Sequence, residues 1–314
     1  GIPQTTPGMP DFLQEMKWET DFLLKMQYND GSGRVSHKLT RKGFEGFVMP
    51  QDDKEKRYFT EWGSAATADF VAIMAMAARY FKPYDAAYAQ KCLDAATVSY
   101  NFLLANPATK DFAQGDFSTG GYQTGDADDR LWAAAEMWET TGNCNSLNDL
   151  ESRIEKLKIM TEENWDWGSV DNLGVFTYAL SKREGKNPQL QAKAKQAIIT
   201  SANQLIEKAG IIGEENSRLL LFLITISYLN KSPLHGIVQG SSGSGKTHII
   251  SRIADLMPQE DVLRFTRITE SSLYNWGEFD LFQKIIIIED LDGLKEDALY
   301  ALREFISNQV LRSS

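Results

Sequence analysis

Residues 240–247 read Gly240-Ser241-Ser242-Gly243-Ser244-Gly245-Lys246-Thr247, a run that fits the pattern G-x-x-x-x-G-K-[ST] without a gap. A short apolar segment at 235–238 precedes the run, and a segment with helical periodicity at 248–256 follows it. Strand, glycine-rich loop and helix form the context in which this motif cradles phosphate. The run therefore predicts a phosphate-binding loop at the start of an α/β unit.

The residue types in the loop indicate how a nucleotide would be held. Glycines allow consecutive backbone N–H groups to turn toward phosphate oxygens at the start of a helix. Lys246 supplies a positive charge for the β- and γ-phosphates, and the Thr247 hydroxyl supplies a ligand for Mg²⁺. We therefore expect ATP and Mg²⁺ as cofactors, with all eight residues from Gly240 to Thr247 in the nucleotide site.

Two further segments fit the same unit. Residues 263–268 form a plausible second strand, and residues 285–288 are four consecutive isoleucines, typical of a fully buried parallel strand. Glu289 and Asp290 follow, where such folds place a magnesium-ordering acid and a water-activating acid. The usual order is Asp before Glu, so which of the two faces the metal stays open. Asp290 is our Mg²⁺ ligand, and the alternative is a solvated turn after an edge strand.

The first 208 residues have a different pattern. Apolar residues recur at helical spacing, and Gly or Pro residues interrupt them. Helices are expected from residue 11, over 65–81 and 86–104, after residue 126, and near 146–160, 170–183 and 189–208. No segment alternates as a strand would. We predict a mainly α chain, with a helical domain at 1–208 and an α/β domain at 209–314.

Aromatic residues precede several of these helix starts: Trp62, Tyr122, Trp165 and Trp167. Ring faces pack on the apolar faces of pyranoses, and neighbouring acids bind hydroxyl groups, so the pattern favours a carbohydrate site. The alternative is structural, because Asp and Ser are ordinary helix caps and Trp is a common core residue.

Asp126, Asp128 and Asp129 form the one dense acidic cluster beside an aromatic loop. If this half hydrolyses glycosides, these are the candidate catalytic carboxyls, and an inverting enzyme needs two of them about 6.5–9.5 Å apart. Two other interpretations stay open. Acidic residues stabilise a helix N-terminus, and carboxylates bind Ca²⁺.

Composition limits the remaining classes. The formal net charge is −10, which argues against a broad nucleic-acid-binding surface. Cys92 and Cys144 are the only cysteines, so no disulfide framework or cysteine metal site is expected. The longest apolar stretch, 219–229, is far shorter than the ~20 residues of a membrane span, and no signal peptide is visible.

The helical half resembles family 9 glycoside hydrolases, mostly endo-β-1,4-glucanases that invert the anomeric centre on an (α/α)6 barrel. The resemblance lies in an early segment at 2–27, in Gly121-Tyr122-Gln123 leading to residues 128–136, and in residues 172–181. The family's Asp-Ala-Gly-Asp base segment and its late acid Glu have no counterpart in this sequence. The resemblance thus implies a partial barrel, about half of the fold, acting on β-glucan.

The second half resembles the ATPase region of primase- and helicase-associated proteins of bacterial mobile elements. The resembling segments are 219–223, 234–246, 261–263, 272–274, 288–293 and 299–304. Later strands with a polar sensor and an arginine finger have no counterpart, so the resemblance implies a truncated P-loop domain with weak turnover.

These observations lead to one prediction and two alternatives. We predict a hybrid cellulase-like glycoside hydrolase with an appended ATP-binding module. The alternatives are a mobile-element-type ATPase with an inert helical half, and a chimeric reading frame with an inactive glycosidase fragment. A glycosidase would be exported and an ATPase cytoplasmic, so localisation stays open. Exposed edges of a partial barrel would favour homo-oligomers.

Overall fold

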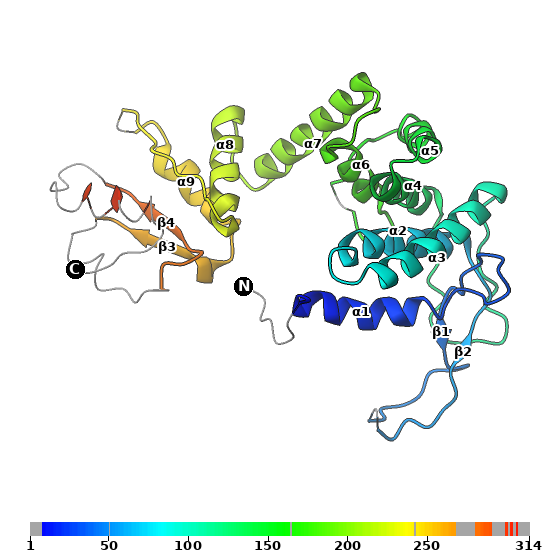
Figure 1. The fold of residues 1–314 in the computed structure, drawn as a ribbon. Helices are drawn as coiled ribbons and strands as arrows, with labels where there is room; N and C mark the ends of the chain where they lie inside the picture. The colour runs from blue at the N-terminus through cyan, green and yellow to red at the C-terminus, as the bar shows by residue number, and fades with distance from the viewer. Residues whose placement is uncertain are drawn as a thin grey trace. The chain divides into compact units, whose positions relative to one another are not determined.

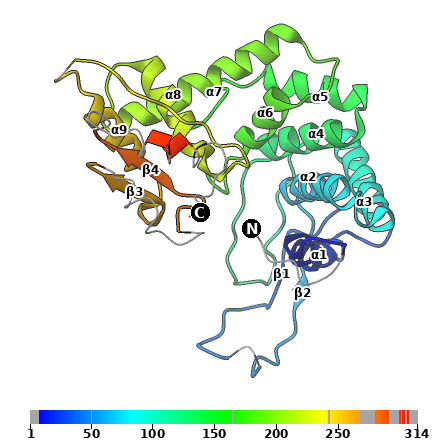
Figure 2. The same cartoon turned by 60° about the vertical axis from the view of Figure 1, so that its left-hand side comes forward.

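The computed structural model describes residues 8–49, 51–163, 165–241, 243–267, 280–290, 299–300, 302–303 and 306 (Figures 1 and 2). The chain divides into two compact units, Gly1–Ile199 and Thr200–Ser314. The first is helical, and the second combines helices with a short parallel sheet. The prediction of a mainly α chain with a partial barrel-like domain and an α/β P-loop unit is confirmed.

In the helical unit, each predicted helix forms within a few residues of its expected bounds. The helices are α1 (Asp11–Leu23), α2 (Ser64–Phe81), α3 (Ala86–Ala105), α4 (Ala127–Thr141), α5 (Cys144–Ile154), α6 (Asp171–Leu180) and α7 (Pro188–Lys208). Helix α4 packs between α2 and α6, while α3 packs on α2 and α5 on α4. Figures 1 and 2 show this pairing of neighbouring helices.

The helix ends have identifiable causes. The Asp85 carboxylate accepts a hydrogen bond from Tyr88 N at the start of α3, and Asn143 caps α5 through Asn145 N. Helix α4 ends at Gly142, whose left-handed conformation, φ 71°, is one that glycine adopts without strain.

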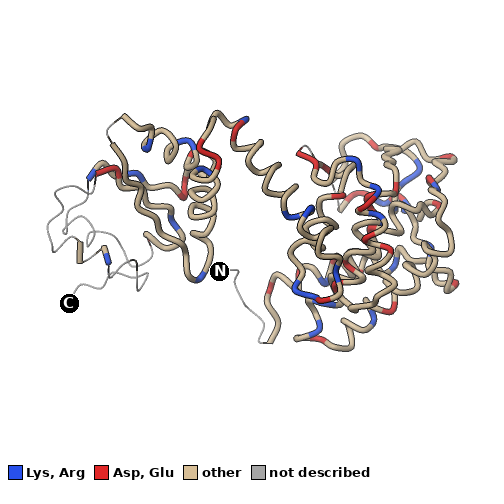
Figure 3. Tube along the Cα trace, turned by 90° about the horizontal axis from the view of Figure 1, so that it is seen from above, with Lys and Arg blue, Asp and Glu red and all other residues tan. Residues whose placement is uncertain are grey.

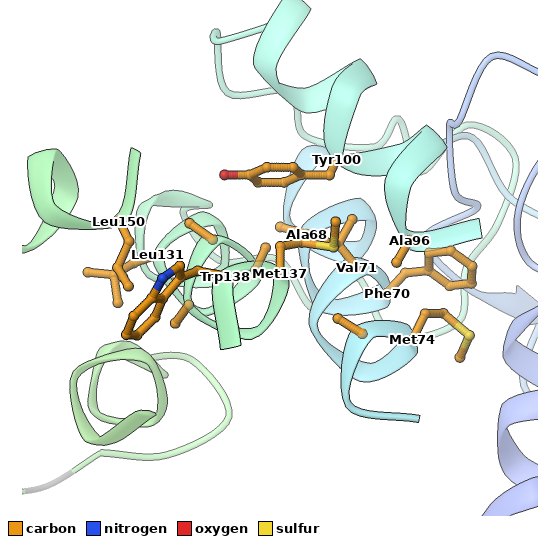
Figure 4. Close-up of a cluster of buried hydrophobic side chains, with 14 of the residues drawn as sticks. Ala68, Phe70, Val71, Met74, Ala96, Tyr100, Leu131, Met137, Trp138 and Leu150 are labelled. Atoms are coloured by element: carbon orange, nitrogen blue, oxygen red, sulfur yellow. The ribbon is translucent and has the colours of Figure 1, made fainter. Parts of the chain in front are cut away.

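The core lies where α2, α3 and α4 meet (Figure 4). Alanines along α2 let the neighbouring helices approach closely, and Trp138 and Leu131 of α4 are almost fully buried, as predicted. Glu136 links three helices, because its carboxylate accepts from Arg79 Nη2 on α2 at 2.6 Å and from Thr177 Oγ1 on α6 at 2.8 Å. This arrangement fixes the C-terminal halves of α2, α4 and α6 relative to one another.

One expectation for the helical unit was wrong, namely that it contains no strand. Residues 39–40 and 58–59 form a small antiparallel ribbon of strands β1 (Leu39–Thr40) and β2 (Tyr58–Phe59). Two-residue strands show no alternation, so the sequence pattern could not reveal them. Helix α1 forms as expected but is only partly covered, because Phe12 is 51% exposed and Met16 36%.

The second unit contains α8 (Glu215–Ile226), α9 (Lys246–Ala254), and strands β3 (Val262–Phe265) and β4 (Ile285–Ile288), with short 3-10 turns at Ser227–Leu229 and Gln259–Asp261. The two strands pair in parallel, Val262 with Ile285 through Phe265 with Ile288. A small core of Ile206, Ile211 and Ile253 joins α8 and α9. The predicted parallel strand at 285–288 is confirmed, although only Ile285 is buried.

The predicted strand at 235–238 does not form. Within the described residues this segment pairs with neither β3 nor β4, and Ile237 is 74% exposed. A strand needs a hydrogen-bonding neighbour, and none of the described strands pairs with this segment.

None of the described helices is long and apolar enough to cross a membrane. In the helical unit, Lys and Arg residues are interspersed with Asp and Glu residues, as Figure 3 shows.

Candidate functional site

Hydrogen bonds join the loop before α2 to the loop before α4. The Lys38 ammonium donates to Gly120 O and to Gln114 Oε1, and His37 Nε2 lies 2.8 Å from Tyr122 O. The His37 ring stacks on Phe112 with 3.9 Å between ring centroids, and burial lowers the pKa of His37. These contacts hold Tyr122 in a defined position beside the start of α4.

The four aromatic residues predicted to bind sugar have two kinds of environment. Tyr122 and Trp167 are 70% and 67% exposed, and their rings meet edge to face with centroids 5.9 Å apart. Trp165 is less exposed and lies edge-on to Phe176. Trp62 is half-buried against Phe102, with the Lys110 ammonium over its ring. The Tyr122–Trp167 pair is therefore the aromatic surface that a ligand can reach.

The acids predicted as catalytic follow Tyr122 closely in the sequence, but their side chains have separate partners. Asp128 accepts a hydrogen bond from Val170 N at 2.8 Å, which connects the starts of α4 and α6. Asp126 is buried and accepts from Arg130 Nε at 2.6 Å and from Thr109 Oγ1 at 2.7 Å. Burial raises the pKa of Asp126, but hydrogen bonds from Ser64, Arg130 and Thr109 outweigh it and hold the pKa below its usual value. The geometry favours a structural role for Asp126.

Asp129 belongs to a carboxyl pair that the sequence pattern did not indicate, with Asp69 on α2 as its neighbour. Asp129 is 3% exposed and Asp69 is half-buried, and Asp129 Oδ2 has no hydrogen-bond partner in the described structure. Burial raises the pKa of Asp129 to about 9, and the nearby Asp69 and Asp128 carboxylates add to the shift. Burial raises the pKa of Asp69 to about 6. Repulsion between the two carboxylates disfavours the doubly ionised state, which favours one proton shared by the pair.

A fourth acid completes what we call the acidic cluster: Asp69, Asp128, Asp129 and Asp171. Asp171 is the first residue of α6, and burial raises its pKa to about 6, with Asp128 and Glu162 adding to the shift. Across the ranges that the structure describes, no three His, Cys, Asp or Glu side chains are arranged to hold a metal ion together. A Ca²⁺ ion at Asp126, Asp128 and Asp129 would therefore need backbone or water ligands as well.

The shared proton predicts how stability changes with pH. The folded-state pKa of Asp129 lies above its unfolded value, so the folded protein binds more protons, and stability falls as pH rises from about 4 to about 9. In Asp129→Asn the amide can donate to Asp69 without a titrating proton. We expect Asp129→Asn to raise stability at pH 8 by about 1–3 kcal/mol, and to flatten the pH dependence.

The measurement is chemical denaturation at pH 5 and pH 8, with Asp116→Asn as control because Asp116 is an exposed acid on a nearby loop. A parent protein whose stability is constant over this range, or an Asp129→Asn variant with the same slope as the parent, would contradict the shared proton.

In the second unit, the predicted phosphate loop leads directly into α9. Gly243 and Gly245 have φ values of 78° and 82°, a conformation that only glycine adopts easily. A Cβ atom on Gly240 would lie 3.2 Å from Ser244 Oγ, so the loop is tight at this point. Ser241 and Thr247 are exposed, and Ser242 lies outside the described residues.

Lys246 contacts its own loop. Its ammonium donates to Gly240 O at 2.8 Å, to Ser241 O at 2.7 Å and to Ser244 Oγ at 3.3 Å. The positive charge is therefore held at the loop and at the N-terminal end of α9, where an anion would bind.

Glu289 and Asp290 leave β4 at its C-terminal end, as predicted. Glu289 is exposed, and Asp290 is half-buried and accepts two hydrogen bonds from Arg267. Sequence reasoning missed Arg267, Asp69 and Asp171. Arg267 lies within the predicted strand at 263–268 and could have been found by asking what the parallel register places beside Asp290. A single Asp in an Ala-rich helix, such as Asp69, carries no such signal.

Comparisons with known proteins treat the two units separately. A family model described as "MTBMA_p00010 P-loop domain" matches residues 199–311. Endoglucanase D of Acetivibrio thermocellus is 53% identical over 206 residues, which is 65% of this chain and 33% of that protein. This chain thus spans about a third of the length of that relative.

Solved structures agree. A metagenome-derived glycoside hydrolase family 9 endoglucanase is 31% identical with a TM-score of 0.58, covering 66% of this chain and 37% of that one. AaCel9A, solved with a cellobiose-like isofagomine, is 26% identical with a TM-score of 0.61, covering 79% of this chain and 48% of that one. The family model "Glycosyl hydrolase family 9" matches residues 3–223, and the chain belongs to this family.

Proposed function

We propose that the helical unit binds β-1,4-glucan across the Tyr122–Trp167 pair and hydrolyses it as an endoglucanase. The observation that carries this proposal is the exposed edge-to-face pair, 5.9 Å between centroids, beside the acidic cluster where α2, α4 and α6 begin. Sugar rings stack on exposed aromatic faces, and carboxylates accept hydrogen bonds from sugar hydroxyls. The family relationship supports the same substrate, since two of the relatives named above are endoglucanases.

Within this proposal, Asp128 is the candidate carboxylate that a substrate can reach. Asp126 and Asp129 are 5% and 3% exposed, whereas Asp128 is half-buried. Inverting hydrolysis needs one carboxyl to donate a proton and a second to activate water. The catalytic roles of Asp126, Asp128 and Asp129 stay predictions, with Asp128 the first to test.

The test is release of reducing ends from carboxymethylcellulose by the purified full chain. We expect weak hydrolysis by the parent and a loss of about 10²-fold or more in Asp128→Asn, the usual effect of removing a general acid or base. Asp111→Asn, on the loop before α4, serves as control. Parent-like activity in Asp128→Asn would remove Asp128 from the mechanism, and absence of activity in the parent would reduce the proposal to glucan binding.

Calcium is the proposed ligand of the acidic cluster. Asp129 Oδ2 is buried without a partner among the described residues, and the negative charges of Asp69 and Asp128 raise the pKa of Asp129, so a divalent cation would relieve their repulsion. Asp128 and Asp129 would hold the ion, helped by backbone oxygens. Chemical denaturation at pH 8 with and without CaCl₂ tests this proposal. Ca²⁺ should raise the stability of the parent and leave the stability of Asp129→Asn unchanged. Equal stabilisation of both would place the ion elsewhere.

The second unit is proposed to bind Mg·ATP. The observation that favours this function is the loop from Gly240 to Thr247, with its left-handed glycines and with the Lys246 ammonium held at the start of α9. Thr247 and Asp290 are the proposed Mg²⁺ ligands, and Glu289 is the proposed water-orienting acid. The bound cation would neutralise phosphate charge. Binding of nucleic acid is not part of this proposal, because the chain carries a formal net charge of −10.

A further inference from the structure

The C-terminal edge of the β3–β4 sheet brings two charged residues together. The parallel pairing continues beyond both strands, with Glu289 N donating to Phe265 O at 2.9 Å and Asp290 N donating to Thr266 O at 3.2 Å. Arg267 and Asp290 therefore leave the sheet side by side, as the adjacent strands of Figure 1 suggest. In open α/β sheets this is the edge at which ligands bind.

The two side chains form a defined ion pair. Arg267 Nε and Nη2 both donate to Asp290 Oδ2, at 3.0 Å and 2.8 Å. The Arg267 side chain is 73% exposed and that of Asp290 33% exposed. Water and small ions can reach such a pair, and an exposed ion pair is weak enough to exchange its partner.

The pair conflicts with the proposed role of Asp290. A divalent cation bound to the Asp290 carboxylate would lie close to the Arg267 guanidinium, which cannot lose its charge to make room. Cation and arginine therefore compete for the same carboxylate. Because the two positive charges repel, a cation that binds Asp290 moves Arg267 away from it.

A second ion pair of the same sheet provides an internal comparison. At the opposite edge, Lys284, which precedes β4, donates to Asp261 Oδ1 at 2.7 Å and to Glu260 O at 2.9 Å. This pair also joins the two strands and is partly exposed. This pair involves neither Glu289 nor Asp290. Removing the Lys284 charge therefore shows how much cation affinity changes through net charge alone, without any local change at Asp290.

We propose that Arg267 is a built-in counter-ion that occupies Asp290 in the nucleotide-free protein, and that a divalent cation binds Asp290 only by displacing it. The inference rests on the proposed Mg·ATP site. Its consequence is that the free protein binds Mg²⁺ poorly. When the cation arrives bound to phosphate, the phosphate provides a negative charge to which the released Arg267 guanidinium can bind.

The test uses Mn²⁺ alone as the probe, with free Mn²⁺ followed by electron paramagnetic resonance during titration of the full chain without nucleotide. Arg267→Gln should bind Mn²⁺ about two- to five-fold more tightly than the parent, the fold-change that corresponds to losing one exposed ion pair. Lys284→Gln should match the parent. Arg267→Gln/Asp290→Asn should lose the gain in affinity.

Three results would overturn the proposal. They are an unchanged Mn²⁺ affinity in Arg267→Gln, an equal gain in Lys284→Gln, and a gain that persists when Asp290 is replaced. The proposed Mg·ATP site has an independent test. Calorimetry with Mg·ATP on Lys246→Ala examines that site without changing Arg267 or Asp290.

Discussion

Lys246→Ala should weaken Mg·ATP binding by about 100-fold, the largest effect we expect from a single change in the second unit. Lys246 is the one cation of the loop from Gly240 to Thr247, and its ammonium is already held there by Gly240 O, Ser241 O and Ser244 Oγ. Its charge-assisted hydrogen bonds to phosphate are worth about 1.5–3 kcal/mol, and 2.7 kcal/mol corresponds to about 100-fold in affinity.

The measurement is calorimetric titration of the full chain with Mg·ATP. Lys284→Ala is the matched control, since it removes one lysine charge from the same unit at the edge of the sheet away from Asp290. Circular dichroism should show the same helix content in all three proteins. Parent-like affinity in Lys246→Ala would exclude a phosphate-binding role for the loop.

Arg130→Ala should destabilise the helical unit by about 3–5 kcal/mol, the cost of breaking a buried ion pair by removing one partner. Arg130 is 4% exposed, and its guanidinium donates to Asp126 Oδ2, to Leu103 O at 2.9 Å and to Asn106 O at 3.0 Å. The substitution would leave a buried carboxylate unpaired and carbonyl groups at the end of α3 without a donor.

Chemical denaturation measures this loss. Arg34→Ala is the control, because Arg34 also pairs with an acid four positions away, Asp30, but both side chains are about 40% exposed, and its removal should cost less than about 1 kcal/mol. The double variant Asp126→Ala/Arg130→Ala should be more stable than the sum of the single effects predicts. Strict additivity would mean that the two residues do not act as a pair.

The helices of the first unit could be predicted because each is a local pattern. Gly63 and Pro83 bracket α2, Asn143 caps α5, and the apolar spacing in α4 points Leu131 and Trp138 inward, where the structure has them. Likewise, four isoleucines before Glu289-Asp290 indicated β4 and its parallel partner. These features depend on neighbours in sequence.

The features that sequence reasoning missed depend on partners far along the chain. The Asp69–Asp129 pair joins residues sixty positions apart, and only the packing of α2 against α4 brings them together. Residues 235–238 have the composition of a strand, but in the part of the chain that the structure describes no strand pairs with them. The acids Asp126, Asp128 and Asp129 are adjacent in sequence, yet the helix points them to Arg130, to Val170 N and to Asp69.

The most direct test of the account is calorimetric titration of the full chain with cellohexaose. We expect saturable binding by the parent. Tyr122→Ala/Trp167→Ala should lose at least about ten-fold in affinity, since each stacked ring is worth about 1 kcal/mol or more. Trp18→Ala, which removes another exposed tryptophan from α1, should bind like the parent. Equal affinity in the parent and the double variant would contradict the account.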